Sequence, residues 1–372
     1  CFMRLGFDAK RIFHNQSGLG NYGRDLVRIL FDNNKKIKYV LFNPKKQNKI
    51  KWNIDKKIIE SNPKGIWKYF SSLWRQGPIN KEIKKNKIDI YHGLSAELPF
   101  RIKSKSIVTV HDLIFYRFPE LYNPIDVLIH KIKIKHAVNN ATRIVAISKQ
   151  TKKDLISFLK VDKNRIHVIY QVCNPIFRKK ITNSQKDLVV NKFKLPEKFV
   201  LFVGTLEKRK NPLIIARALK KSNYNMVFIG KLKNEGKNLK NYIRENGMVS
   251  RVKFIHNISI EDLSIIYKIA TVFCYPSIFE GFGIPIIEAL NSGIPVITSK
   301  GGCFNEAGGP FSEYINPKDK DELRNKIDMI FNESIKKRRE RAINGFKYLK
   351  KFDEKIISNQ WINLYESIHM DE

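Results

Sequence analysis

Two glutamates, eight residues apart, are the residues whose type and spacing best suggest chemistry. Glu280 and Glu288 flank a Gly-Phe-Gly turn in the run FEGFGIPIIEAL. A carboxylate accepts hydrogen bonds well from the paired hydroxyl groups of a ribose or a sugar, so the pair favours a polyhydroxylated ligand. The alternative is that Glu288 only complements a helix dipole and Glu280 is a solvated loop charge.

The elements around this pair predict a βαβ unit. Residues 271–277 are apolar, β-branched and aromatic, which indicates a buried strand. Pro285 suits the first helical position, Gly293 ends the helix, and residues 295–299 form the next strand. Ligands of parallel sheets bind at the carboxyl ends of strands, and a helix start attracts anions, so we expect a nucleotide-sugar site.

A second strand-to-helix turn carries three consecutive cations. Gly204 ends a strand, Asn211 is expected to cap the next helix, and Pro212 fits its first turn. The run Lys208–Lys210 therefore crowds a helix start, where the dipole disfavours cations. A diphosphate between the cations and the helix would explain this placement, and a solvated cationic turn is the alternative.

Candidates elsewhere carry weaker signals. Gly18 and Gly20 form a G-x-G between the first strand and a helix, which could serve the turn alone. His111 ends a strand, where it could donate to a substrate hydroxyl or merely bond to the backbone, and His92 ranks below it. Glu306 follows a strand in a glycine-rich loop, either near the paired glutamates or on the surface.

We expect no bound metal. Asp319 and Asp321 form a D-x-D, but Asp319 and Glu322 have the spacing of a helix capping box. The four cysteines lack metal-ligand spacing and indicate a reducing compartment.

Strand-like runs alternate with helix-length segments over all 372 residues, which predicts an α/β protein with parallel sheets. The length favours two domains. We expect two Rossmann-like domains facing a cleft, with the following boundaries: residues 1–178, an N-terminal acceptor domain; 179–197, a linker; 198–353, a C-terminal nucleotide-sugar donor domain; and 354–372, a helix that packs back on the first domain.

The net charge of +35, from 70 Lys and Arg against 35 Asp and Glu, suggests an anionic partner or compositional drift. A basic and then aromatic stretch suits an anionic membrane surface, and no nucleic-acid motif accompanies it. With no apolar run of ~18 residues and no signal peptide, we expect a cytoplasmic, peripheral protein. The stretch comprises Lys45, Lys46, Lys49, Lys51, Lys56, Lys57, Trp67, Tyr69, Phe70 and Trp74.

Taken together, these motifs resemble the GT-B glycosyltransferases, in particular the retaining family 4 enzymes that use a nucleotide-sugar. The likeness covers nearly the whole chain, in the runs GFDAKRIFHNQSGLGNYGRDL, VTVHDLIFYRFPELY, IVAISKQTKKDL, RIHVIY, LFVGTLEKRKNP and SIFEGFGIPIIEALNSGIPVITS. The second of these runs resembles bacterial mannosyltransferases of polysaccharide or lipopolysaccharide assembly.

The resemblance implies roles for individual residues. Glu288 would bind the ribose, Glu280 would contact the transferred sugar, and His111 would lie near the reacting carbon. Cations and helix dipoles, not a metal, would meet the charge of the leaving group, and no carboxylate nucleophile is required. The other expected donor contacts are Gly18, Gly20, Gly204, Thr205, Arg209, Lys210, Phe282, Gly283 and Ile284. Thr205 departs from the family pattern, in which Arg is frequent, so Arg209 and Lys210 would carry more of the diphosphate.

The expected function is transfer of a hexose with retention of configuration, with mannose from GDP-mannose as the first choice and GDP-sugars favoured over UDP-sugars. The acceptor would be a glycan or a lipid-linked glycan in surface polysaccharide synthesis. Two alternatives remain at this point: a nucleotide-sugar 2-epimerase of the same fold, and a non-catalytic protein that binds anionic lipid or nucleic acid.

Overall fold

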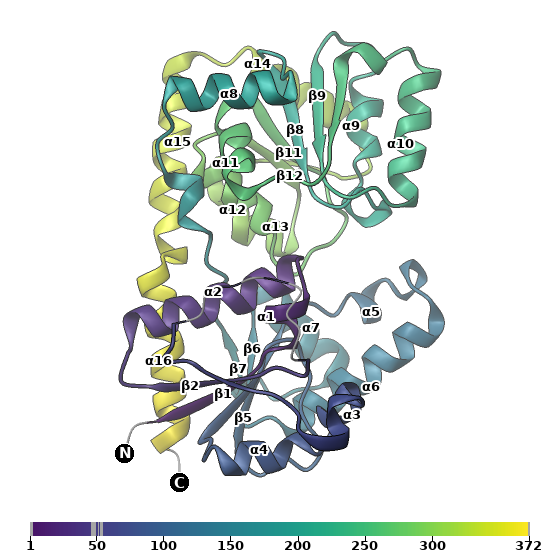
Figure 1. The fold of residues 1–372 in the computed structure, drawn as a ribbon. Helices are drawn as coiled ribbons and strands as arrows, with labels where there is room; N and C mark the ends of the chain where they lie inside the picture. Colours follow the sequence, from purple (N-terminus) through teal and green to yellow (C-terminus); the bar gives the residue numbers. More distant parts are fainter. Residues whose placement is uncertain (1–2, 46–49, 51, 53–54, 371–372) are drawn as a thin grey trace. The chain divides into compact units, whose positions relative to one another are not determined.

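The computed structural model describes residues 3–45, 50, 52 and 55–370. Contacts between residues divide the chain into two compact units. Unit 1 comprises Cys1–Val172 and Phe352–Glu372, and unit 2 comprises Cys173–Lys351. Each unit is an α/β domain with a parallel sheet, as predicted (Figure 1).

The sheet of unit 1 has seven parallel strands in the order β3-β2-β1-β4-β5-β6-β7. The central strands are buried on both faces, which explains why they read as continuous apolar runs. Their bounds are β1 Arg4–Asp8, β2 Lys38–Phe42, β3 Ile59–Ser61, β4 Ile90–Gly93, β5 Lys105–Val110, β6 Arg143–Ala146 and β7 Ile166–Val168.

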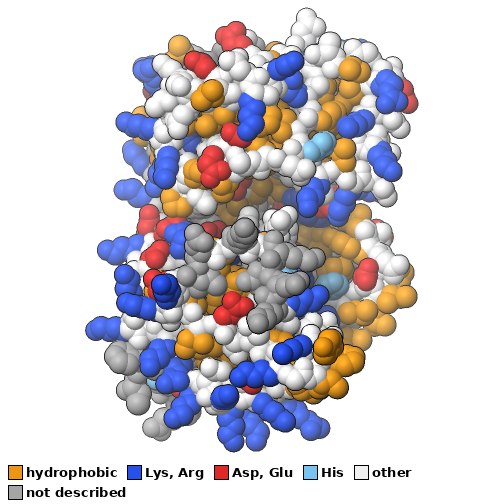
Figure 2. Space-filling view, in the orientation of Figure 1, with side chains coloured by type: hydrophobic (Ala, Val, Ile, Leu, Met, Phe, Trp, Pro, Cys, Tyr) orange, Lys and Arg blue, Asp and Glu red, His pale blue; other side chains and the backbone are white. Residues whose placement is uncertain are grey.

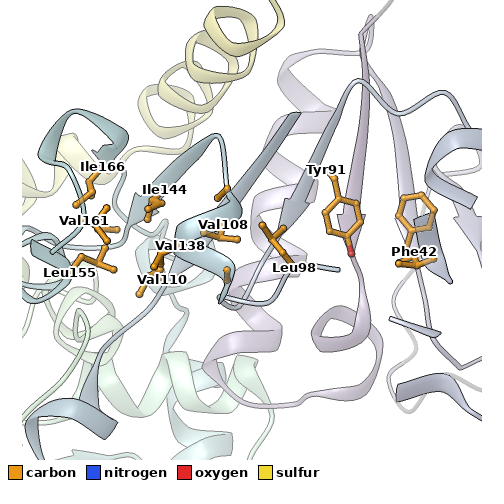
Figure 3. Packing of buried hydrophobic residues seen from close by; sticks show 14 of the residues in the cluster. Phe42, Tyr91, Leu98, Val108, Val110, Val138, Ile144, Leu155, Val161 and Ile166 are labelled. Atoms are coloured by element: carbon orange, nitrogen blue, oxygen red, sulfur yellow. The ribbon is translucent and has the colours of Figure 1, made fainter. Parts of the chain in front are cut away.

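Helices cover both faces of this sheet. On one face, α4, α6 and α7 contribute to the hydrophobic core around Tyr91, Val108 and Ile144 (Figure 3). On the other face, α2 packs beside α16. The helices of unit 1 are α1 Lys10–His14, α2 Gly18–Asn33, α3 Ser71–Trp74, α4 Ile79–Lys85, α5 Ile114–Arg117, α6 Pro124–Asn140, α7 Lys149–Leu159 and α16 Glu354–Met370.

The C-terminal helix α16 belongs to unit 1. Its Trp361 and Tyr365 are fully buried, and the Tyr365 hydroxyl lies 2.7 Å from Nδ1 of His92. The other ring nitrogen of His92 lies 2.8 Å from the Thr109 hydroxyl. Burial lowers the pKa of His92 to about 3, so His92 is a neutral core residue that joins α16 to the sheet.

Unit 2 contains six parallel strands in the order β10-β9-β8-β11-β12-β13. The strands are β8 Phe199–Val203, β9 Asn225–Ile229, β10 Val252–Ile255, β11 Val272–Tyr275, β12 Val296–Ser299 and β13 Glu313–Ile315. The helices are α8 Asn183–Phe193, α9 Leu213–Ala218, α10 Asn234–Glu245, α11 Ile260–Ile269, α12 Ile284–Asn291, α13 Gly302–Gly308, α14 Lys320–Phe331 and α15 Ile335–Leu349.

The structure corrects the expected boundary between the domains. Residues 179–197, expected as a linker, contain α8, whose start is closed by a capping box between Thr182 and Gln185. This segment and residues 173–178 belong to unit 2. The polar composition of α8 concealed the helix, because only Val189 on it is buried. The two short edge strands β3 and β13 were not predicted either, since each is three residues long and carries a glutamate.

The basic and aromatic stretch is only partly exposed. Trp74 is buried in the core of unit 1, whereas Tyr69 and Phe70 are exposed. Lys46, Lys49 and Lys51 lie outside the described residues.

Gly18 and Gly20 lie within the first turn of α2, not in a turn between a strand and a helix. A Cβ atom on Gly20 would lie 1.8 Å from the carbonyl oxygen of Asn15, so only glycine fits there. A Cβ atom on Gly18 would meet nothing within 4 Å.

This contrast predicts opposite effects of two alanine substitutions. Gly20→Ala should destabilise unit 1 by about 1–3 kcal/mol, because the backbone of α1 and α2 must separate. Gly18→Ala, the matched control, should leave the stability unchanged or raise it by up to about 1 kcal/mol. Chemical denaturation of both variants measures the effect, and equal midpoints would contradict the packing argument.

Candidate functional site

The turn between β11 and α12 has the predicted strand-to-helix form. Gly283 precedes α12 with a φ of 105°, a conformation that disfavours side chains other than glycine, and Pro285 lies in the first turn of the helix. The helix runs Ile284–Asn291, and Gly293 follows its end with a φ of 77°. The backbone therefore requires glycine at position 283, before the helix, and favours it at position 293, after the helix.

Glu280 is held by four side chains of unit 2. Its Oε1 accepts from Nζ of Lys210 at 2.8 Å and from the hydroxyls of Tyr275 and Ser277 at 2.9 and 3.0 Å. Its Oε2 lies 2.8 Å from Nη1 of Arg209. The sequence predicted that the cations bind a diphosphate and that the carboxylate binds hydroxyls, but the cations and the carboxylate pair with each other.

The pKa values reflect this pairing. Burial raises the pKa of Glu280, but Lys210 and Arg209 outweigh burial and lower it to about 2. Burial also disfavours the charge of Arg209, yet Glu280, Tyr275 and Glu207 raise its pKa above the ordinary value. Glu280 and Arg209 are therefore both charged throughout the physiological range.

The three cations form a 3₁₀ turn, Lys208–Lys210, before α9 and not the start of that helix. The expected cap at Asn211 is wrong. This residue has a φ of 55°, and its side-chain amide donates to the carbonyl oxygens of Pro276 and Pro317. A backbone hydrogen bond of 2.8 Å from Ile278 to Arg209 also joins the two loops.

Gly204 lies immediately beside this turn. Its φ is 148°, and a Cβ atom there would lie 3.1 Å from the Lys210 side chain. The adjacent Thr205 is half-buried. Both residues are thus close to the cluster that holds Glu280.

Glu288 lies on α12 and has a partner that the sequence analysis missed. The hydroxyl of Tyr267, on α11, donates to Oε2 of Glu288 at 3.0 Å. Tyr267 is fully buried, and its pKa is well above the ordinary value because of burial and the nearby carboxylate. Its hydroxyl therefore stays protonated and orients the carboxylate. A buried tyrosine eight residues after the N-cap of a helix gave no functional signal in the sequence.

Other candidates of unit 2 occupy different surroundings. Phe282 is buried and Ile284 is half-buried at the start of α12. Glu306 was expected in a loop, but it lies on helix α13 and its carbonyl accepts from Tyr348. Cys303, also on α13, was overlooked; its Sγ lies 3.0 Å from the carbonyl oxygen of Glu280.

His111 follows β5 and lines a cavity of about 120 Å³ in unit 1. Its Nε2 lies 2.8 Å from the Leu94 carbonyl oxygen and must donate to it, while the Gln171 amide lies 3.3 Å from Nδ1. Burial lowers the pKa of His111 to about 4, so the ring is neutral at pH 7. The sequence left open whether this histidine bonds to the backbone or faces a ligand. The structure shows the hydrogen bond to the backbone, and the ring also borders the cavity. Its lining includes Arg11, Glu97, Asp112, Tyr116 and Lys133.

Within residues 3–45, 50, 52 and 55–370, no group of three or more His, Cys, Asp or Glu side chains could hold a metal ion. Asp319 accepts from the backbone N–H groups of Asp321 and Glu322 at the start of α14, so it acts as a helix cap.

The two parallel-sheet α/β units match solved GT-B glycosyltransferase structures. One match is the Anabaena protein HepE, solved in complex with UDP-glucose. This match covers 98% of the present chain and 100% of HepE, with a TM-score of 0.76 and 18% sequence identity. This likeness establishes the fold.

The sequence comparisons place each unit in a known family. Residues 17–175 match the family model for Glycosyltransferase Family 4, and residues 183–348 match the one for Glycosyl transferases group 1. The chain is therefore a glycosyltransferase that combines these two family domains.

Two curated relatives are named as mannosyltransferases. O-antigen chain mannosyltransferase B of Escherichia coli is 26% identical over 74% of this chain and 74% of its own length. O-antigen chain mannosyltransferase RfbU of Salmonella typhimurium is 28% identical over 60% of each chain. The resemblance to bacterial mannosyltransferases is confirmed.

The Glu280 cluster predicts a pH-dependent stability. Glu280→Gln should lower the free energy of unfolding at pH 7 by about 3–5 kcal/mol, because Arg209 and Lys210 lose their buried partner. The ordinary pKa of 4.5 falls to about 2 on folding. The contribution is therefore complete above about pH 4.5 and is lost as the pH falls toward 2.

Denaturation at several pH values tests this prediction. The gap between wild type and Glu280→Gln should narrow from pH 5 to pH 2, and the exposed Glu245→Gln on α10 serves as the control. If the difference in free energy of unfolding between wild type and Glu280→Gln stayed constant from pH 5 to pH 2, these contacts would not be lowering the pKa of Glu280.

Proposed function

We propose that this glycosyltransferase moves mannose from GDP-mannose, with retention of configuration and without a metal, to a glycan or lipid-linked acceptor of a surface polysaccharide. It would act in the cytoplasm as a peripheral membrane protein. The observation that carries the proposal is the buried cluster of Glu280, Arg209 and Lys210 beside the start of α12. The mannosyltransferase names of the two relatives support the choice of sugar.

The cluster is suited to a diphosphate. An ammonium group has three donors, and Tyr275 and Glu280 account for two of those of Lys210. Arg209 already donates to Glu280, Glu207 and the Phe279 carbonyl, so its contribution is a fixed positive charge beside the turn. Lys208 is exposed in the same turn and adds charge. We infer that the phosphate oxygens bind to this turn while Glu280 keeps both cations oriented.

Glu288 is proposed to bind the ribose of the donor. Tyr267 fixes the carboxylate in one orientation, and a carboxylate accepts from vicinal hydroxyls. The contacts of each glutamate support this division of roles: Glu280 pairs with cations, and Tyr267 donates its neutral hydroxyl to Glu288.

The surroundings of Glu280 favour a mechanism without a carboxylate nucleophile. Its oxygens accept from two cations and two hydroxyls, which stabilises negative charge and makes attack on a sugar carbon unfavourable. Retention of configuration would then result if the acceptor hydroxyl attacks the sugar carbon from the same face from which the phosphate departs. Arg209 and Lys210 would stabilise the charge on that phosphate, which is the task a metal performs elsewhere.

Donor binding should depend strongly on Glu288. Glu288→Ala should weaken GDP-mannose binding by about 10- to 100-fold, because a hydrogen bond to a charged group contributes about 1.5–3 kcal/mol. Isothermal titration with GDP-mannose, UDP-glucose and ADP-glucose measures this and identifies the nucleotide. Glu245→Ala is the matched control, as Glu245 is an exposed helical glutamate of the same unit. Tighter binding of UDP-glucose than of GDP-mannose would refute the donor assignment.

The stereochemistry and the metal requirement can be read from one reaction. The mannosyl product should have the α configuration of the donor by NMR, and the rate should be unchanged in EDTA. A β-linked product or a rate restored only by Mg²⁺ or Mn²⁺ would contradict the mechanism. Release of a free epimerised sugar with no transfer would instead indicate the 2-epimerase.

A further inference from the structure

Helix α6 has apolar residues on two opposite faces. Val127, Ala137 and Val138 are buried against the core of unit 1. The other face carries Ile125, Leu128, Ile129 and Ile132, with exposed fractions of 68, 60, 43 and 59%. Their spacing of i, i+3, i+4 and i+7 forms one continuous stripe. In the described part of unit 1 this stripe remains largely exposed to solvent, and a contiguous exposed apolar stripe indicates a binding surface.

Neighbouring elements extend the stripe. Phe100 is half exposed, and its ring centroid lies 4.5 Å from that of His136 on α6. A small cavity is lined jointly by Gln76, Phe100 and Ile132, which brings the segment after α3 to α6. Figure 2 shows hydrophobic side chains gathered over α3 and α6 with Lys and Arg among them. We call this surface the docking face: Tyr69, Phe70, Leu73, Phe100, Ile125, Leu128, Ile129 and Ile132.

The charges beside the docking face are mainly positive. Helix α6 has three lysines, at positions 131, 133 and 135, against one acid, Asp126. On a helical projection the lysines lie beside the apolar stripe and not within it. Lysines can keep their ammonium groups at headgroup level while apolar side chains enter the acyl region. An excess of cations also complements a negatively charged surface.

We propose that the docking face binds an anionic lipid bilayer, with the stripe of α6 in the acyl boundary and the flanking lysines on lipid phosphates. The helix lies in the interface and does not cross it: in the part of the chain that the structure describes, no helix is long and apolar enough to span a membrane. The docking face shares Tyr69 and Phe70 with the basic and aromatic stretch that predicted membrane contact, and it adds the stripe of α6.

The docking face is continuous with the cavity beside His111. Glu97 and Lys133 line both that cavity and the one that contains Phe100 and Ile132. An amphiphilic acceptor would therefore place its lipid on the docking face and its sugar toward His111, past the Glu97–Lys133 ion pair (3.5 Å) that lines both cavities. This extension rests on the proposed function, because it requires transfer to a lipid-linked acceptor.

Vesicle flotation of the full chain tests the docking face without using the enzymatic activity. Wild type should float with vesicles of phosphatidylcholine and phosphatidylglycerol at low salt, and less with phosphatidylcholine alone or at high salt. Leu128→Glu should reduce the partition coefficient at least tenfold. Leu188→Glu, on α8 of unit 2, is the matched control, since Leu188 is an exposed helical leucine of similar exposure, 67% against 60%.

Both leucines are exposed, so the substitutions should leave the melting temperature unchanged, and circular dichroism checks this. Flotation of Leu128→Glu equal to wild type, or an equal loss for Leu188→Glu, would overturn the proposal. The proposal would also be overturned if the wild type did not bind vesicles but formed dimers that Leu128→Glu dissociates. The docking face would then bind a second copy of this chain. If flotation depends on Leu128 while no nucleotide-sugar binds, the docking face stands and the proposed function fails.

The extension to the acceptor has a separate readout. Leu128→Glu should reduce transfer to a lipid-linked acceptor in vesicles at least tenfold, while transfer to a short water-soluble acceptor stays at the wild-type rate. Equal losses for both acceptors would refute the extension and leave the flotation result intact.

Discussion

The buried ion cluster of Glu280, Arg209 and Lys210 holds together the part of unit 2 to which we assign the donor. Glu280 follows β11, and the two cations follow β8, its neighbour in the sheet. A buried charge is tolerated only when it is paired and hydrogen-bonded, so the cluster joins two loops that are about 70 residues apart in sequence. The turn before α12 and the cationic turn before α9 thus form one rigid arrangement.

Unit 1 is held together by comparable long-range contacts, but these are hydrogen bonds between uncharged groups. Tyr365, near the C-terminus, bonds to His92 on β4, and Ser358 bonds to the carbonyl of Ile29 on α2. The hydroxyls satisfy buried polar atoms that would otherwise destabilise the core. This closure covers one face of the sheet with α2 and α16. Helix α6 lies on the opposite face, where its outer side remains available for lipid.

Local pattern was sufficient for most of the fold. The central strands are apolar runs bounded by glycine and polar residues, so their positions and the parallel α/β class were predictable. Edge strand β3 and helix α8 were not predicted from the sequence, because few of their residues are buried and neither shows an apolar pattern. The glycine-rich run around Glu306 was misread for a related reason: helix α13 is stabilised by burial of Cys303, Phe304 and Ala307, against the low helix propensity of glycine.

By itself, the sequence determined the family, the two parallel sheets and the residue types of the site, because strand-end glycines, carboxylates and cations are local signals. Only the tertiary structure decided which groups meet. It paired Glu280 with the cations, supplied Tyr267 to Glu288, placed His92 in the core and turned the apolar stripe of α6 outward. Those outcomes depend on contacts between residues far apart in the chain and on which side of a helix faces the core, and neither quantity is contained in a local pattern.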